Sequence, residues 1–166
     1  MRSLRLAVSL TALLAIAACG DAGDAPPPPP PQSVSAQSVG HYCGMALADH
    51  AGPKGQIFIQ GRPDPVWFSS IKQLFAYTLL PEEPKAVSAL YVNDMGTAGP
   101  DGKPDPAAWI DARKAFYVIE GRFIGGMGAE DAMPFSQRAD AQTFSQTHGG
   151  RVVAFSDVPE QYVFAQ

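Results

Sequence analysis

Cysteine is scarce in this 166-residue sequence, which contains only Cys19 and Cys43. Zinc sites use three or four Cys, His or carboxylate ligands, so one or two thiols are too few for the common cysteine sets. Basic residues are also scarce, because 12 Lys and Arg stand against 16 Asp and Glu and give a formal net charge of −4. Nucleic-acid binding requires basic patches that neutralise phosphates, so this composition argues against a nucleic-acid partner.

A membrane-spanning apolar run is missing as well. The longest run, residues 6–18, contains Ser9 and Thr11 and is about 13 residues long, whereas a spanning helix needs roughly 17–25. Arg2 and Arg5 precede this run, which is typical of a signal peptide. We therefore expect residues 1–18 to direct export and to be removed.

The end of the signal run, Leu14-Ala15-Ile16-Ala17-Ala18-Cys19, resembles a bacterial lipobox, in which the cysteine thiol receives diacylglycerol. Residues 19–39 include six consecutive prolines and have little to bury, so they predict a disordered, lipidated tether. More than one acyl chain on Cys19 would anchor the chain stably. These features predict a periplasmic lipoprotein, and both the inner and the outer membrane stay open.

Lipidation of Cys19 would leave Cys43 without an intramolecular partner. In an oxidising compartment an unpaired thiol indicates intermolecular pairing or a reactive function. The alternative is a buried, inert cysteine, which is common in protein cores.

Residues 40–166 predict one α+β domain of two packed lobes, residues 40–96 and 107–166, each with the order β-β-α-β. A Gly-, Pro- and Asp-rich connection separates them. The first helix starts at Ser69 or Ser70 and ends before Pro81, and the second starts at Ser136 and ends at Gly149. The expected strands are residues 41–47, 56–59 and 89–92 in the first lobe, and 115–119, part of 121–133 and 151–155 in the second.

Soft donors gather around the unpaired thiol. If residues 41–47 form a strand, Cys43 and Met45 point to the same face, because side chains alternate with period two. Thiolate and thioether sulfur select copper(I) over magnesium, calcium or manganese. Met127 is the expected third donor. Three glycines flank it and supply no apolar surface, so Met127 is not expected to be part of a hydrophobic core. Other candidates for an additional donor are His41, His50, Met95 and Met133, whereas His148 at a helix end is better placed for capping.

Several motifs together resemble the NosL family, the copper chaperones of nitrous oxide reductase. The first is His41-Tyr42-Cys43-Gly44-Met45, continuing to His50-Ala51-Gly52-Pro53-Lys54-Gly55-Gln56-Ile57. The others, in the same order along the chain, are Trp109-Ile110-Asp111-Ala112, Met127-Gly128, Pro134-Phe135 and His148-Gly149-Gly150. They cover nearly the whole folded part.

The resemblance implies two β-β-α-β lobes that bind one copper(I) per monomer through Cys43, Met45 and Met127. It also implies delivery of copper for maturation of the copper-sulfide centre of nitrous oxide reductase in denitrification. The implied partners are the apo reductase, other copper-centre maturation proteins and, through the lipid on Cys19, a membrane. A copper-bridged dimer stays open.

Two alternatives belong to other classes of function. A thiol enzyme could use Cys43 as nucleophile with His41 or His50 as base, although the neighbouring methionine has no role in that chemistry. A structural or interaction lipoprotein would simply bury Cys43. The chaperone reading predicts transfer by ligand exchange, with no catalytic turnover.

Overall fold

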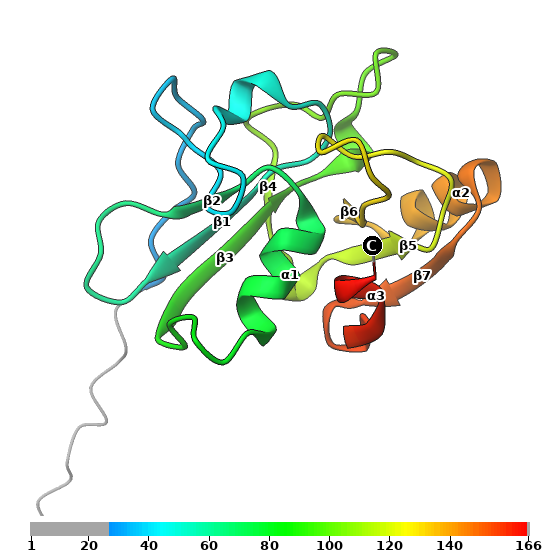
Figure 1. Ribbon diagram of the computed structural model, residues 1–166. Coiled ribbons are helices and arrows are strands. Elements are labelled where there is room, and N and C mark those ends of the chain that lie inside the picture. Colours follow the sequence, from blue (N-terminus) through cyan, green and yellow to red (C-terminus); the bar gives the residue numbers. More distant parts are fainter. Residues whose placement is uncertain (1–26, 166) are drawn as a thin grey trace, which may run out of the picture.

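The computed structural model describes residues 27–165; the predicted signal peptide, Cys19 and the start of the predicted tether lie outside this part. Two antiparallel sheets stand side by side, with helix α1 packed between them (Figure 1). The first sheet and its helix comprise β1 (Gly55–Ile59), β2 (Val66–Phe68), α1 (Ile71–Leu79), β3 (Val87–Asn93) and β4 (Trp109–Asp111). The second set comprises β5 (Phe116–Ile119), β6 (Met133–Phe135), α2 (Arg138–His148), β7 (Arg151–Ala154) and the terminal helix α3 (Glu160–Phe164).

The predicted repetition of the order β-β-α-β is confirmed. The strand order is β2-β1-β3 in one sheet and β6-β5-β7 in the other, so the first strand of each lobe lies in the centre. Strand β4 extends the first sheet, because it pairs with β3 from Asn93↔Trp109 to Tyr91↔Asp111. The chain therefore crosses to the second lobe only after β4.

The expected strand at residues 41–47 is wrong. These residues form a tight turn instead, followed by a short 3-10 helix at Leu47–Asp49. Gly44 has a φ of +68°, a left-handed conformation that does not occur in a regular strand. The first strand of the lobe is β1, and Cys43 and Met45 do not alternate along a strand.

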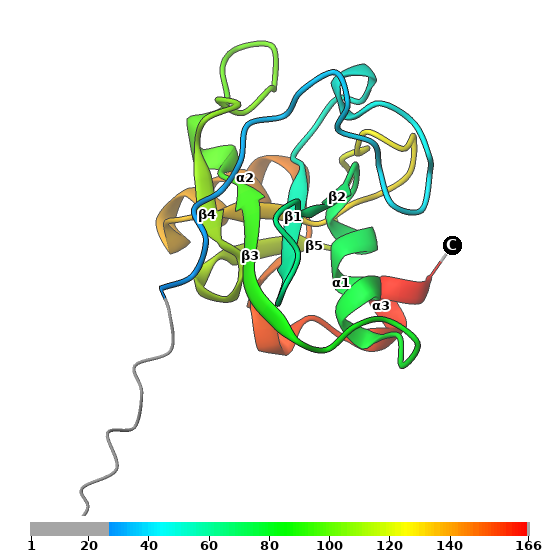
Figure 2. The ribbon, with the colours of Figure 1, turned by 90° about the vertical axis from the view of Figure 1, so that its left-hand side faces the viewer.

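The described part of the predicted tether packs on the first sheet. The carbonyl of Pro29 accepts a hydrogen bond from Tyr91 Oη at 2.8 Å, and Gln32 exchanges two hydrogen bonds with the buried Gln56 side chain. Gln56 lies on the face of β1 opposite Ile57, which faces α1. The segment therefore covers the outer face of the sheet (Figure 2). Prolines leave their backbone carbonyls free to accept hydrogen bonds. Here the segment is held to the sheet by hydrogen bonds with the side chains of Tyr91 and Gln56 rather than acting as a free spacer.

One apolar core joins the lobes. Leu74 and Phe75 of α1 pack with Ile57 of the first sheet and with Tyr117 and Ile119 of the second. Helix α3 lies against α1 and closes the open end of this core. A smaller cluster under α2 contains Met95, Val118, Phe123, Met133, Phe135 and Ala141.

The start of α1 is capped by a carboxylate from the other lobe. Asp131 is 2% exposed, and its oxygens accept hydrogen bonds from the backbone N–H groups of Ile71 and Lys72 at 3.0 and 2.8 Å. They also accept from Ser70 Oγ and from the N–H of Ala132. Burial raises the pKa of Asp131, and these four hydrogen bonds oppose that rise. Helix N-termini leave N–H groups unpaired, and here the second lobe supplies their acceptor.

The first lobe in turn supplies a carboxylate to the start of the helix in the second lobe. Asp94, which follows β3, accepts a hydrogen bond from the N–H of Ser136 at 3.1 Å. Helix α2 begins only at Arg138, after Gln137, so the predicted cap at Ser136 is one residue early. Each lobe thus supplies a carboxylate to the helix entrance of the other.

We expect Asp131→Asn to lower the free energy of unfolding by about 2–4 kcal/mol, because the amide nitrogen would face backbone N–H donors in a buried place. Urea unfolding followed by circular dichroism measures this change. Asp64→Asn, at an exposed acidic residue, is the control and should change stability by less than about 0.5 kcal/mol. Equal stability of the two variants would contradict the assigned role of Asp131.

Candidate metal site

Residues 40–45, called here the cysteine loop, hold Cys43 at the surface. The loop closes through hydrogen bonds from the N–H of Gly40 to the carbonyl of Met45 and from the N–H of Gly44 to the carbonyl of Gly40. A side chain at Gly40 would place its Cβ 2.5 Å from Cys43 Sγ. Glycine at position 40 therefore leaves room for the half-buried thiol.

Residues 124–130, called here the methionine loop, hold Met127. Ile124 and Glu130 form an isolated bridge at its base, and the N–H of Gly125 donates to the carbonyl of Ala129. A Cβ on Gly125 would lie 2.6 Å from the side chain of Asp131. Glycine at position 125 therefore lets the loop pack directly against the residue that caps α1.

Ser69 brings the two loops together. Its side chain is fully buried between β2 and α1, and its Oγ lies 3.3 Å from Cys43 Sγ and 3.2 Å from Met127 Sδ. The two sulfurs, which are 84 positions apart in the chain, are thus within two hydrogen-bond lengths of each other. The predicted pairing of Cys43 with Met127 has this geometric basis, whereas Ser69 was expected only as a helix cap.

Met45 has a different setting. It lies in the cysteine loop, two residues from Cys43, and its side chain is 45% exposed. The reason given for its proximity to Cys43, alternation along a strand, does not apply. Its exposure instead gives an unbranched thioether side chain freedom to turn toward Cys43.

Of the additional donor candidates, His50 is the one at the methionine loop. Its Nδ1 lies 2.8 Å from the carbonyl of Gly126, next to Met127. A carbonyl can only accept, so Nδ1 carries the hydrogen and Nε2 carries the lone pair. Within residues 27–165, this buried Nε2 has no hydrogen-bond partner. The two backbones approach closely here, since a Cβ on Gly126 would lie 2.2 Å from the carbonyl oxygen of Ala51.

The other candidates lie elsewhere. His41 is exposed and pairs with Glu83, with Nε2 3.2 Å from Oε1. Met95 and Met133 pack in the apolar cluster under α2. His148 stacks on Phe144 at a ring distance of 4.2 Å, in the last turn of α2.

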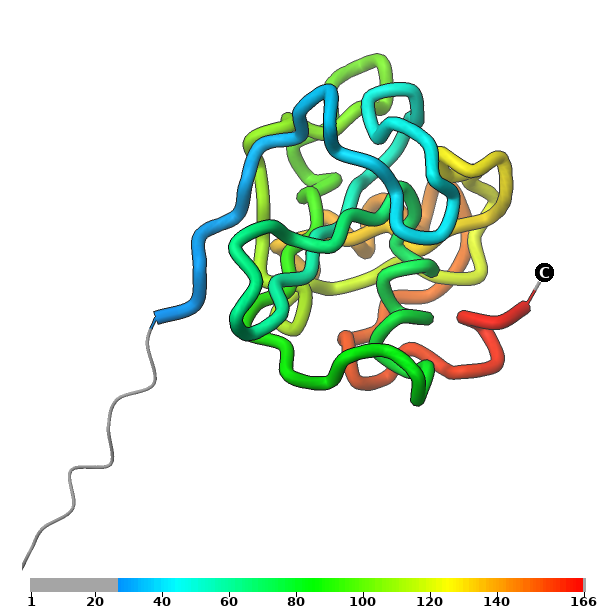
Figure 3. The backbone as a smooth tube through the Cα atoms, turned by 60° about the vertical axis from the view of Figure 1, so that its left-hand side comes forward, coloured from blue at the N-terminus to red at the C-terminus, as the bar shows by residue number. Residues whose placement is uncertain are grey.

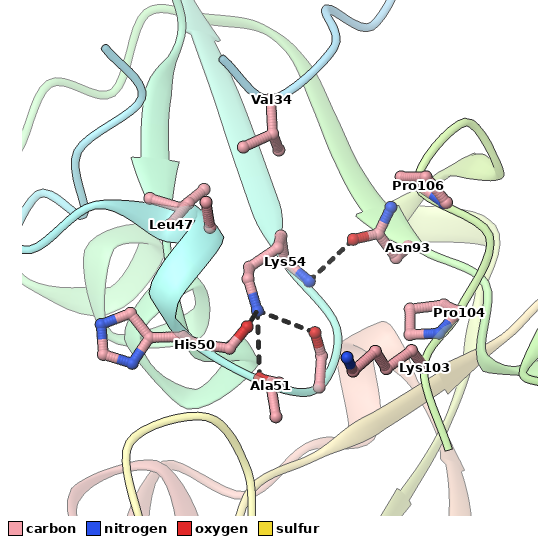
Figure 4. Close-up of a pocket in the computed structure, with 11 residues that line it drawn as sticks. Val34, Leu47, His50, Ala51, Lys54, Asn93, Lys103, Pro104 and Pro106 are labelled. Carbon is pink, nitrogen blue, oxygen red and sulfur yellow. Dashed lines mark hydrogen bonds between the residues drawn. The ribbon is translucent and has the colours of Figure 1, made fainter. Parts of the chain in front are cut away.

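Sequence reasoning missed Lys54, which supports this arrangement. Its Nζ donates hydrogen bonds to the carbonyls of His50, Ala51 and Gly52 at 2.6, 3.0 and 2.9 Å (Figure 4). Its own backbone exchanges two hydrogen bonds with Asn93. Burial lowers the pKa of Lys54 to about 8, and the negative charge of Asp131 opposes that shift. The Lys54 side chain thus stabilises the turn that carries His50, through hydrogen bonds to three of its carbonyls.

The arrangement suits a soft cation. A thiol and a thioether sulfur, both on half-buried residues, contact the same serine hydroxyl, and soft donors of this kind favour soft metal ions. Over residues 27–165, no group of three or more His, Cys, Asp and Glu side chains could hold a metal ion. In the same part of the chain, no helix is long and apolar enough to cross a membrane.

The family model NosL matches residues 31–163. The copper-binding lipoprotein NosL of Achromobacter cycloclastes is 44% identical over 133 residues, which are 80% of this chain and 69% of that protein. The protein of the same name from Stutzerimonas stutzeri is 38% identical over 120 residues, which are 72% of this chain and 61% of that one. The chain thus spans less than two thirds of the second relative.

A solved structure shares the fold. The crystal structure of the copper chaperone NosL from Shewanella denitrificans superposes with a TM-score of 0.74 at 32% sequence identity. The match covers 81% of this chain and 98% of that one.

Lys54 predicts a pH dependence of stability. An unfolded lysine keeps its proton up to about pH 10.5, whereas folded Lys54 releases it near pH 8. Between these values the unfolded state binds more protons, so the free energy of unfolding should rise with pH. We expect Lys54→Met to remove this rise, measured by urea unfolding at several pH values. Lys114→Met, at an exposed lysine, is the control and should keep it; a rise that persists in Lys54→Met would contradict the assignment.

Proposed function

The chain belongs to the NosL family, and we propose that it carries copper(I) as cargo for the maturation of the copper-sulfide centre of nitrous oxide reductase. The observation that carries this proposal is the placement of Cys43 Sγ and Met127 Sδ on either side of the buried Ser69 hydroxyl. The names of its relatives, copper-binding lipoprotein and copper chaperone, support the copper part.

Cys43, Met127 and Met45 are the proposed ligands. A thiolate with two thioethers is a soft set that favours copper(I). Cys43 and Met127 come from different lobes and already lie close together, whereas the exposed Met45 side chain completes the set by turning inward. His50 is the proposed additional donor, because its Nδ1–H is engaged by a carbonyl and its Nε2 lone pair is free. Such a second hydrogen bond orients many metal-binding histidines.

The site is proposed to exchange its cargo without catalytic turnover. A thiol enzyme would need a base in contact with Cys43, yet within residues 27–165 neither candidate imidazole makes that contact: His41 contacts Glu83, and His50 contacts the carbonyl of Gly126. The hydrogen-bond partner of Cys43 is a serine hydroxyl instead. An open, sulfur-rich site on two loops lets a partner's donors replace its ligands one at a time.

The compartment follows from the predicted front end. Both curated relatives are named lipoproteins, which supports lipidation of Cys19 after removal of residues 1–18. The proposed location is the periplasm, with the domain held to a membrane by its lipid. Its proposed partners are the apo reductase and the proteins that assemble the reductase's copper centres.

Copper binding is tested by anaerobic competition with a copper(I)-specific chelator, using the full-length protein in detergent. We expect Cys43→Ser to lower copper(I) affinity by roughly 100-fold or more and Met127→Leu by roughly tenfold, with smaller losses for Met45→Leu and His50→Ala. The matched control is Met133→Leu, which removes a thioether from the core and should leave affinity unchanged. A wild-type protein that takes no copper from the chelator would falsify the proposal.

Delivery is tested in a denitrifying strain that lacks this gene. Wild type should restore the copper content and the copper-sulfide absorption of purified nitrous oxide reductase, whereas Cys43→Ser should not. In the same cells, Cys19→Ser should move the protein from the membrane fraction to the soluble fraction. Full copper loading by Cys43→Ser would contradict the delivery role, and membrane retention of Cys19→Ser would contradict the anchor.

A further inference from the structure

The hydroxyl of Ser69 has one hydrogen and three acceptors within reach. Besides Cys43 Sγ and Met127 Sδ, its Oγ lies 3.4 Å from Gln73 Oε1, one turn further along α1. Ser69 is 0% exposed, so its hydrogen must be given to one of these groups rather than to bulk water. Met127 Sδ and Gln73 Oε1 can only accept from Ser69, and the contact to Met127 Sδ, at 3.2 Å, is the shorter of the two.

We propose that Ser69 is a positioning residue of the copper site, whose hydroxyl holds the Met127 thioether in the copper-free protein and turns to the Cys43 thiolate when copper binds. This inference rests on the proposed function, because it assumes that Cys43 and Met127 are ligands. It assigns to Ser69 a role that is distinct from metal ligation.

The exchange follows from the relative strength of the acceptors. A thioether is a weak acceptor, and a hydroxyl hydrogen bonded to its sulfur competes with a soft metal for the lone pairs of that sulfur. When copper binds, the Cys43 thiol releases its proton to solvent and serves as a thiolate, and a charged acceptor forms a stronger hydrogen bond than a neutral one. The hydroxyl therefore rotates toward Cys43 and releases Met127. No covalent bond to Ser69 forms or breaks, and its buried hydrogen stays paired throughout.

The fold supplies a matched control for this role. Ser136 occupies in the second lobe the place that Ser69 has in the first, because each follows the phenylalanine that ends the second strand of its lobe. Ser136 makes its contact to Asp94 through its backbone N–H, which an alanine retains. Ser136→Ala thus removes a comparable hydroxyl away from the sulfurs.

The copper-free half of the proposal is tested by oxidation with dilute hydrogen peroxide, followed by peptide mass spectrometry. The probe is the rate of Met127 oxidation relative to Met45 in the same chain. We expect Ser69→Ala to raise this ratio by about three- to tenfold, because the sulfur lone pair loses its hydrogen bond. Gln73→Leu removes the competing acceptor and should leave the ratio equal to or below that of wild type, and Ser136→Ala should leave it unchanged.

These variants separate the hydrogen bond from general loosening. A loosened α1 entrance would speed Met127 oxidation in both Ser69→Ala and Gln73→Leu, and that outcome would overturn the inference. An unchanged ratio in Ser69→Ala would overturn it too. Because this measurement uses no copper, its result is independent of whether the chain binds the metal.

The copper-bound half is tested by the same chelator competition. We expect Ser69→Ala to lower copper(I) affinity by roughly tenfold, while Ser136→Ala stays within about twofold of wild type. Wild-type binding with equal affinity in Ser69→Ala would overturn the role of Ser69 and leave the proposed function standing. Absence of copper binding by wild type would instead overturn the proposed function.

Discussion

The buried carboxylate of Asp131 is the contact on which the arrangement of this molecule depends. It comes from the second lobe, directly after the methionine loop, and it caps the helix of the first lobe. The same helix entrance carries Ser69 and Ser70, so one carboxylate determines how Met127 lies relative to the serine that also contacts Cys43. A charge buried without these four donors would be strongly unfavourable, which makes the docked position of the lobes specific.

Around this contact, the site is assembled from three loops rather than from regular elements. The cysteine loop, the methionine loop and the turn at residues 50–54 meet at short hydrogen bonds: Ser69 between the sulfurs, His50 on Gly126, and Lys54 on three carbonyls. Rigid strands and α1 lie directly beneath them. Loops on a fixed base can exchange ligands while the core stays in place, which suits a protein that must release what it binds.

Much of the fold could be predicted from local signals, and the reasons for the misses are specific. The helix at Ile71–Leu79 follows from apolar spacing and from Pro81, and β5, α2 and β7 lie within two residues of their predicted limits. Strand β6 (Met133–Phe135) instead begins where the predicted range 121–133 ends. The strand predicted at residues 41–47 was wrong because alternating apolar character also fits a turn once Gly44 adopts a positive φ. The packing of residues 27–39 on the sheet was not predicted, because it depends on Gln56 and Tyr91, which are distant in sequence.

In the candidate site, too, the contacts between residues distant in sequence could not be predicted. Cys43 and Met127 were identified from composition and glycine context, but nothing local to either reveals their approach. Ser69 and Lys54 act through contacts with groups far along the chain or with backbone carbonyls, and neither type of contact leaves a pattern in the sequence. The sequence does repeat a Phe-Ser pair, at Phe68-Ser69 and Phe135-Ser136, but these pairs lie at helix entrances and indicate no link between sulfurs.

The cover of the first sheet by the N-terminal segment also sets how the domain stands on its support. The carbonyl of Pro29 contacts Tyr91 on the sheet, and only the nine residues 20–28 lie between Pro29 and Cys19, so at full extension the ten steps reach about 35 Å. The described chain begins at the left side of the molecule in Figure 3, whereas the cysteine and methionine loops lie at the right side. If Cys19 carries the proposed lipid, this short segment would keep the domain near the bilayer, with the point of attachment and the sulfur pair on different sides of the molecule.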